Sequence, residues 1–97
     1  MDDDAPGDAI PVVMYATGGC IFCFLARRLL KHKGVAFQEI RVDRDPEQWD
    51  VMEARSGRHT VPQVFAGERH LGGYTDLAVL DREGALDEAL GLSGPGN

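Results

Sequence analysis

The two cysteines of the chain, Cys20 and Cys23, stand three residues apart at the start of a helix-patterned segment and directly after two glycines. Cys20 would lie at or beside the helix N-cap, where unpaired backbone N–H groups and the helix dipole stabilise a thiolate. Cys23 would lie one turn further on the same face, with the two Cβ atoms about 5–6 Å apart, which permits a disulfide. The spacing predicts a redox pair in which Cys20 attacks and Cys23 resolves.

Two other interpretations of this pair are possible. Cysteine packs as a small hydrophobic residue, so both side chains could simply fill a core. A structural zinc site needs four ligands. The chain adds only three histidines, His32, His59 and His70, and none stands at paired ligand spacing. The sequence therefore favours the redox pair and predicts no metal site.

The composition is that of one small globular domain. The chain has 97 residues, of which 43% are hydrophobic and 27% charged, and this length is near the lower end for a core without metals or disulfides. No stretch approaches the roughly 20 apolar residues of a membrane span. The N-terminus is acidic and lacks the basic start of a secretory signal. We expect a cytoplasmic protein with no membrane partner.

The net charge of −6 is concentrated at the N-terminus. Residues 1–9 hold four of the sixteen acidic residues and predict a disordered acidic leader. The remaining residues carry twelve acidic against ten basic side chains. No basic face of the kind that binds DNA or RNA is visible, so no nucleic-acid partner is expected. Residues 10–92 are expected to form the domain, and residues 93–97 a flexible tail.

The first half of the chain predicts a strand, a helix and a second strand. Residues 10–15 are apolar and β-branched, as in a buried strand. The helix should end near Gly34, behind three basic residues. Residues 35–42 alternate as a strand in which Phe37 and Ile40 contribute to the core. The apolar residues at helical spacing between the strands are Phe22, Leu25, Ala26, Leu29 and Leu30.

The second half predicts a helix, a hairpin and a broken helix. Asp45 is a suitable N-cap with Pro46 at the first helical position, and Gly57 ends that helix. Two strand-like pieces flank Gly67-Glu68, which predicts a type II′ turn. Residues 74–90 form a helix broken at Gly84. The order βαβ-α-ββ-α predicts an α/β fold with a four-stranded mixed sheet flanked by helices, and a right-handed first crossover.

Three segments resemble the landmarks of dithiol glutaredoxins of the small bacterial type. They are "MYATGGCIFCFLARRLL", "TVPQVF" and "LGGYTDL", in that order, and the similarity extends from Val12 to Leu90. The resemblance implies a thioredoxin-like fold and a glutathione-dependent thiol–disulfide oxidoreductase. It also implies glutathione as co-substrate without a bound cofactor, protein disulfides or glutathionylated proteins as substrates, and a monomer.

The resemblance also implies a glutathione site. The Val61–Pro62 peptide would be cis and face the cysteines, so that the Val61 backbone pairs with an incoming peptide. The N–H groups at the start of the last helix would receive a carboxylate, and Asp76 would receive an ammonium group. The expected glutathione contacts are Phe22, Thr60, Val61, Pro62, Gly73, Tyr74, Thr75 and Asp76.

Two residues between the cysteines depart from the family pattern. Many members have Pro and Tyr where this chain has Ile21 and Phe22. Loss of the proline is associated in the family with some members that hold a [2Fe–2S] cluster between two subunits and two glutathiones. A cluster-binding dimer is therefore an alternative. A second alternative is an electron donor that thioredoxin reductase, rather than glutathione, reduces.

Two further departures concern the glycine carboxylate of glutathione. The family usually has Lys at the position of Thr17, and commonly Arg or Gln at the position of Trp49. We therefore expect a weakened site for the glycine end and an intact one for the γ-glutamyl end. Arg55 and Arg58 are candidates to compensate, although both also fit the description of solvated surface charges.

Overall fold

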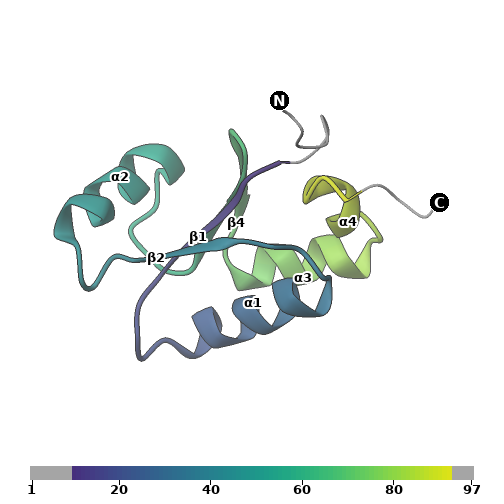
Figure 1. Cartoon of the computed structure of the whole chain (residues 1–97), viewed down its shortest axis with the longest axis horizontal. Coiled ribbons are helices and arrows are strands. Elements are labelled where there is room, and N and C mark those ends of the chain that lie inside the picture. The colour runs from purple at the N-terminus through teal and green to yellow at the C-terminus, as the bar shows by residue number, and fades with distance from the viewer. Residues whose placement is uncertain (1–9, 93–97) are drawn as a thin grey trace.

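The computed structural model describes residues 10–92 and shows one sheet between two layers of helices (Figure 1). The predicted leader and tail lie outside the described residues. In chain order the elements are β1 (Val12–Ala16), α1 (Ile21–His32), β2 (Gln38–Arg41), α2 (Pro46–Ser56), β3 (Gln63–Ala66), β4 (Arg69–Gly72), α3 (Tyr74–Arg82) and α4 (Leu86–Ala89). None of these helices is long and apolar enough to span a lipid bilayer.

The four strands form a mixed sheet in the order β2-β1-β3-β4. β1 is parallel to β2 and antiparallel to β3, and β3 is antiparallel to β4. The predicted α/β fold is confirmed. At one edge of the sheet Ala16 is paired with Arg41 and Tyr15 with Gln63. The loop that leads to Cys20 therefore leaves β1 beside the end of β2 and the start of β3.

Each face of the sheet has its own apolar cluster. α1 and α3 cover one face and α2 covers the other (Figure 1). The larger cluster joins the first face to α1, α3 and α4 and includes Met14, Cys23, Leu30, Val64 and Leu77. The smaller cluster lies under α2 and comprises Tyr15, Val42, Met52 and Phe65. β1 and β3 contribute to both clusters because successive side chains of a strand point to opposite faces.

The helix and turn signals in the second half of the sequence are confirmed. α2 has Asp45 as N-cap, Pro46 as its first residue and Gly57, with φ of +71°, as its left-handed C-cap. Gly67 has φ of +60° and the following Glu68 has a negative φ, as a type II′ turn requires. α3 ends before Gly84, and the short α4 follows.

The second strand is shorter than predicted. It covers only Gln38–Arg41, because the edge strand pairs with β1 alone, over Val13–Ala16. Phe37 lies outside the strand, partly buried against the larger cluster. Ile40 is partly buried against the smaller one. The expected alternation was therefore right about the buried residues and wrong about the length.

Phe22 does not belong to the core, contrary to its place in the helical pattern. Its side chain is 52% exposed, whereas Cys23, Ala26 and Leu30 are the buried residues of α1. The first turn of α1 lies at the edge of the sheet, where its outer side is exposed among residues 10–92. The ring of Phe22 instead stacks on that of Tyr74, with the centroids 6.3 Å apart.

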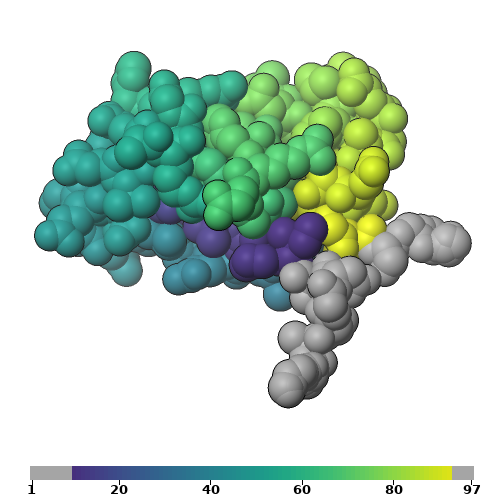
Figure 2. All heavy atoms as spheres, turned by 90° about the horizontal axis from the view of Figure 1, so that it is seen from above, coloured from purple at the N-terminus to yellow at the C-terminus, as the bar shows by residue number. Residues whose placement is uncertain are grey.

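The two halves of the chain meet at the start of β1. Figure 2 shows the beginning of β1 beside α4, with the β3–β4 hairpin on the same face. The Gly67 N–H donates to the Pro11 carbonyl at 2.8 Å, and the Ile10 side chain reaches Gly91. The C-terminal helix thus closes the domain against its first strand.

A two-pronged ion pair fastens α1 to the edge strand β2. The guanidinium of Arg27 donates from Nε and Nη2 to the carboxylate of Glu39 at 2.8 and 2.6 Å. Both side chains are about three-quarters buried. Arg27 holds the pKa of Glu39 below its usual range, mainly through the hydrogen bonds. The ionised carboxylate therefore stabilises the folded state.

We expect Glu39→Gln to lower the free energy of unfolding by about 1 kcal/mol at pH 7. Because the folded-state pKa of Glu39 is depressed, its contribution is complete above the unfolded value of about 4.3. It is lost as the pH falls through the folded-state value. Urea titrations of both proteins between pH 2.5 and 7 should therefore converge in acid. Glu68→Gln, in the exposed hairpin turn, is the control, and a pH-independent loss in Glu39→Gln would contradict the ion-pair assignment.

Candidate active site

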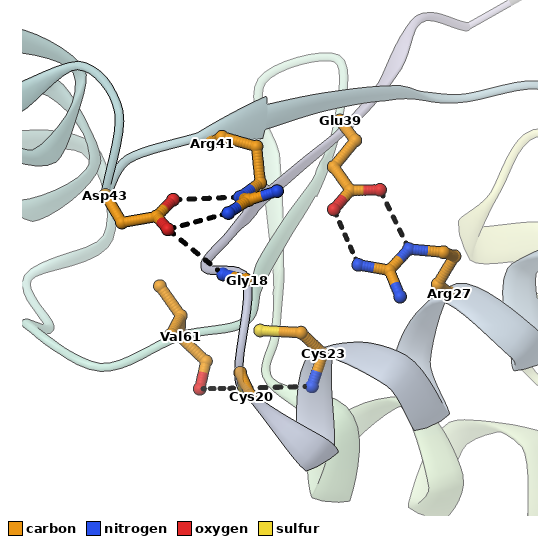
Figure 3. A network of polar contacts seen from close by, with 8 residues as sticks. All are labelled: Gly18, Cys20, Cys23, Arg27, Glu39, Arg41, Asp43 and Val61. Carbon is orange, nitrogen blue, oxygen red and sulfur yellow. Dashed lines mark hydrogen bonds and ion pairs between the residues drawn. The ribbon is translucent and has the colours of Figure 1, made fainter.

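Cys20 is the N-cap of α1 and lies between the end of β1 and the start of β3. Its backbone is extended, with φ of −93° and ψ of 116°, and its Sγ accepts a hydrogen bond from the Cys23 N–H at 3.0 Å. Across a gap, Sγ lies 3.8 Å from the Val61 carbonyl oxygen, to which the thiol donates (Figure 3). This sulfur therefore lies against a backbone N–H donor at the N-terminal end of α1.

Cys23 has the opposite environment. Its side chain is fully buried in the larger cluster. Burial, followed by the hydrogen bond with Cys20, raises the pKa of the Cys23 thiol to about 12. Both cysteines are free thiols in this structure. Of the pair, only Cys20 is partly exposed to solvent.

A second ion pair of β2 holds the loop before Cys20. Arg41 donates to the carboxylate of Asp43 at 2.8 and 2.7 Å, and Asp43 also accepts from the Gly18 N–H at 3.2 Å (Figure 3). Arg41 keeps the pKa of Asp43 far below its usual range. Asp43 thus remains ionised at any physiological pH and ties the loop to the end of β2. No sequence pattern marked Arg41 or Asp43, and the pairing of β1 with β2 brings both residues to the loop at Gly18.

An open groove of about 370 Å³ runs from Val61, the contact of Cys20, to the start of α3. The Val61–Pro62 peptide that borders it is cis. The structure brings together all eight residues that the resemblance assigned to glutathione, Phe22, Thr60, Val61, Pro62, Gly73, Tyr74, Thr75 and Asp76, and adds Arg58 and Gln63. The residues that sequence similarity grouped are therefore neighbours in space.

The far end of the groove is built around Asp76. Its carboxylate accepts from the Gly73 N–H and from Nη1 of Arg58, each at 2.9 Å. These two donors, Arg58 first, hold the pKa of Asp76 below its usual range. Thr75 is exposed at the start of α3. This end of the groove therefore offers a carboxylate, a guanidinium and a hydroxyl side by side.

Gln63 is a buried residue of the groove lining that was not predicted as a site residue. It is a buried polar residue, 1% exposed. Its amide donates to the carbonyl and hydroxyl oxygens of Thr60 at 3.0 and 3.3 Å. Its Oε1 lies 2.7 Å from Nε2 of His70, a group whose pKa burial lowers. The network fixes the segment before Pro62, and a polar residue inside a strand was its only sequence signal.

The residues considered for the glycine carboxylate are dispersed. Thr17 is half-buried, and Trp49 donates its indole N–H to Glu53 at 2.8 Å. Arg55 stacks on Phe65, 4.0 Å from the ring centroid, and donates to the Tyr15 hydroxyl. These contacts hold the Arg55 guanidinium between α2 and the sheet, away from the groove.

Arg58 and His59, which follow α2, have different surroundings from Arg55. Arg58 does reach the groove, but at the Asp76 end. His59 is exposed and is not among the residues that line the groove. Within residues 10–92, no three His, Cys, Asp or Glu side chains are grouped so as to hold a metal ion.

Known proteins match this fold and sequence closely. The family model described as Glutaredoxin matches residues 12–71. A glutaredoxin of Pseudomonas aeruginosa is 48% identical over 80 residues, which cover 82% of this chain and 95% of that one. Glutaredoxin 3 of Escherichia coli is 44% identical over 79 residues, 81% of this chain and 95% of that one.

Solved structures agree with the sequence matches. The solution structure of the Brucella melitensis glutaredoxin, 42% identical, superposes with a TM-score of 0.76 over 92% of this chain and 99% of that one. The buckwheat glutaredoxin–glutathione complex, 27% identical, also has a TM-score of 0.76, over 86% and 78%. The thioredoxin-like fold expected from the sequence is confirmed. The chain belongs to the glutaredoxin family of thiol–disulfide oxidoreductases.

Proposed function

We propose that this protein reduces protein disulfides and glutathione mixed disulfides with glutathione as the electron source. The observation that carries the proposal is the contrast between its two sulfurs. Sγ of Cys20 is partly exposed, lies beside the carbonyl of Val61 at the border of the groove and accepts a backbone N–H. Sγ of Cys23 is buried and protonated. Cys20 is therefore the proposed attacking thiol, and Cys23 is the proposed resolving thiol.

In the first step the Cys20 thiolate attacks a sulfur of the substrate disulfide. A new S–S bond forms to Cys20, the substrate S–S bond breaks, and the leaving thiolate takes up a proton from solvent. With a glutathionylated protein the mixed disulfide is between Cys20 and glutathione. A second glutathione thiolate then attacks its glutathione sulfur, which releases glutathione disulfide and restores Cys20.

With a protein dithiol, Cys23 resolves the mixed disulfide. The Cys23 pKa is raised by burial and, secondarily, by the hydrogen bond and charge of Cys20. Once Cys20 is bonded to substrate it no longer carries that charge, so loss of the Cys23 proton becomes easier. The Cys23 thiolate then attacks Sγ of Cys20, and the substrate leaves as its dithiol. Oxidised enzyme returns to the thiol form at the expense of two glutathiones.

The groove provides a site for each end of the γ-glutamyl group. Its ammonium group meets Asp76, and its α-carboxylate meets the N–H groups at the start of α3, with the Thr75 hydroxyl as a further donor. The Val61 backbone pairs with the cysteinyl part of glutathione. A structural relative, the buckwheat protein, forms a complex with glutathione. In this chain Arg58 is an additional cation for the α-carboxylate.

Two alternatives stay open to test. Ile21, in place of the family proline, motivates a [2Fe–2S] cluster shared by two chains, which would replace the monomer that we propose. Visible absorbance of anaerobically purified protein would reveal such a cluster. A coupled assay that compares glutathione with thioredoxin reductase as the electron source tests the second alternative, the reductase-fed donor.

We expect Cys20→Ser to abolish reduction of both substrate classes, because a serine hydroxyl forms no comparable nucleophile near neutral pH. Cys23→Ser should retain removal of glutathione from a glutathionylated peptide and lose reduction of protein dithiols. Coupled spectrophotometric assays with both substrates measure this division. If the two variants kept or lost both activities together, the assigned roles would be wrong.

A cation introduced at position 17 should strengthen glutathione binding. Thr17→Lys would restore a partner for the glycine carboxylate, and such a pair near the surface is worth between about 0.2 and 1.4 kcal/mol, depending on its exposure. The Michaelis constant for a glutathionylated peptide should fall by a factor of about 1.5 to 10. Ala36→Lys, exposed in the loop before β2, adds the same charge at the opposite end of the strand and should have no effect. An unchanged constant in Thr17→Lys would show that the carboxylate does not lie beside the loop.

Asp76→Asn should raise the Michaelis constant for glutathionylated peptides and leave the turnover number nearly unchanged. The amide still accepts from the Gly73 N–H but cannot neutralise an ammonium group. Because the pKa of Asp76 is depressed, wild-type binding should not change through its titration between pH 5 and 8. Thermal melts control for folding. Equal constants in the two proteins would remove Asp76 from the site.

A further inference from the structure

The outer side of α1 has exposed apolar residues next to the reactive sulfur. Ile21 is 68% exposed, Phe22 52% and Phe24 53%. They occupy the first turn after Cys20. Large apolar side chains grouped on the surface in this way indicate a contact site for another molecule.

The same helix is a basic element in an acidic protein. The segment Ile21–His32 has no Asp or Glu. Arg27 is neutralised by Glu39, and Lys33, just beyond the helix, by Asp81 and Asp87. Arg28 and Lys31 form no ion pair with any side chain of residues 10–92, so their charges are available to a partner.

Two hollows flank these available cations. One, of about 240 Å³, is lined by Phe24, Arg27, Arg28 and Lys31. The other, of about 560 Å³, is lined by Leu25, Arg28, Leu29, Lys31, His32 and Tyr74. Arg28 and Lys31 belong to both hollows and form the ridge between them. Each hollow combines apolar walls with a cationic rim.

This surface is continuous with the groove. Tyr74 lines the larger hollow and also the groove beside Cys20. Its ring stacks on that of Phe22. A chain that places a disulfide against Cys20 can therefore continue over this aromatic pair and along α1 without crossing another element.

We propose that the outer side of α1 docks protein substrates that carry an acidic segment a few residues from the reactive cysteine and an apolar residue beside that cysteine. The proposal rests on the proposed function and names the substrate class of the same site. Charge complementarity to Arg28 and Lys31 selects the acidic segment. The exposed apolar side chains at the start of α1 accept the apolar residue.

The geometry of the helix sets the spacing within the substrate. Arg28 and Lys31 are eight and eleven residues from Cys20, or about 12 and 16 Å along the helix. An extended chain advances about 3.3 Å per residue. The acidic residues should therefore be the fourth and fifth residues from the substrate cysteine. They are N-terminal or C-terminal to it, depending on which part of the substrate chain runs along α1.

The test uses glutathionylated peptides with one cysteine and a neighbouring Phe. Two Glu or two Lys are placed at the fourth and fifth positions, on the N-terminal side in one pair of peptides and on the C-terminal side in another. For one of the two sides, kcat/KM at low salt should be about three- to tenfold higher with Glu than with Lys. This preference should weaken as salt is added.

Charge-reversal variants locate the effect on α1. The double variant R28E/K31E should lose or invert the preference. R69E/R82E, on the hairpin and at the end of α3, makes the same change in net charge and should keep it. Both variants should reduce the small disulfide of cysteine and glutathione at the same rate.

Two results would overturn the docking surface alone. One is equal rates with Glu and Lys peptides on both sides while the small disulfide is still reduced. The other is equal loss of the preference in both double variants. Failure of the wild-type protein to reduce even the small disulfide would overturn the proposed function, and the docking surface with it.

Discussion

Everything at the site depends on the hydrogen bond by which the Cys23 N–H reaches Sγ of Cys20. The bond exists because α1 begins at Cys20, and α1 begins there because β1 ends at the sheet edge and its loop turns back over the sheet. The same turn buries Cys23 under the helix while Cys20 stays at its rim. The start of α1 therefore leaves Sγ of Cys20 partly exposed and buries Sγ of Cys23.

The rest of the sheet holds the partners of Cys20 in place. β3 begins directly after the cis Val61–Pro62 peptide, and the carbonyl of Val61 faces Sγ of Cys20. Buried Gln63 fixes Thr60, the residue before the cis peptide, through two hydrogen bonds. Rigid strands therefore carry both the Cys20 loop and the segment opposite it, which preserves the geometry of the site.

Ion pairs distribute charge around this frame with separate roles. Arg27 and Glu39 join α1 to β2, and Arg41 with Asp43 ties down the loop before Cys20. The pair between Arg58 and Asp76 spans the far end of the groove. These guanidinium groups are engaged within the domain, whereas Arg28 and Lys31 on α1 pair with no side chain of residues 10–92. A protein with a net negative charge can thus present a basic surface beside Cys20, the proposed nucleophile.

Local patterns in the sequence determined the elements, because capping residues, glycines and apolar periodicity act within a few residues. They predicted the start of α2 at Pro46, the turn at Gly67 and the position of Cys20 at a helix start. Pairing over distance was decided by the tertiary structure. The length of β2 follows from the four residues of β1 that it meets, and Arg58 meets Asp76 eighteen residues away. Exposure of Phe22 depends likewise on what lies opposite, which no local periodicity can show.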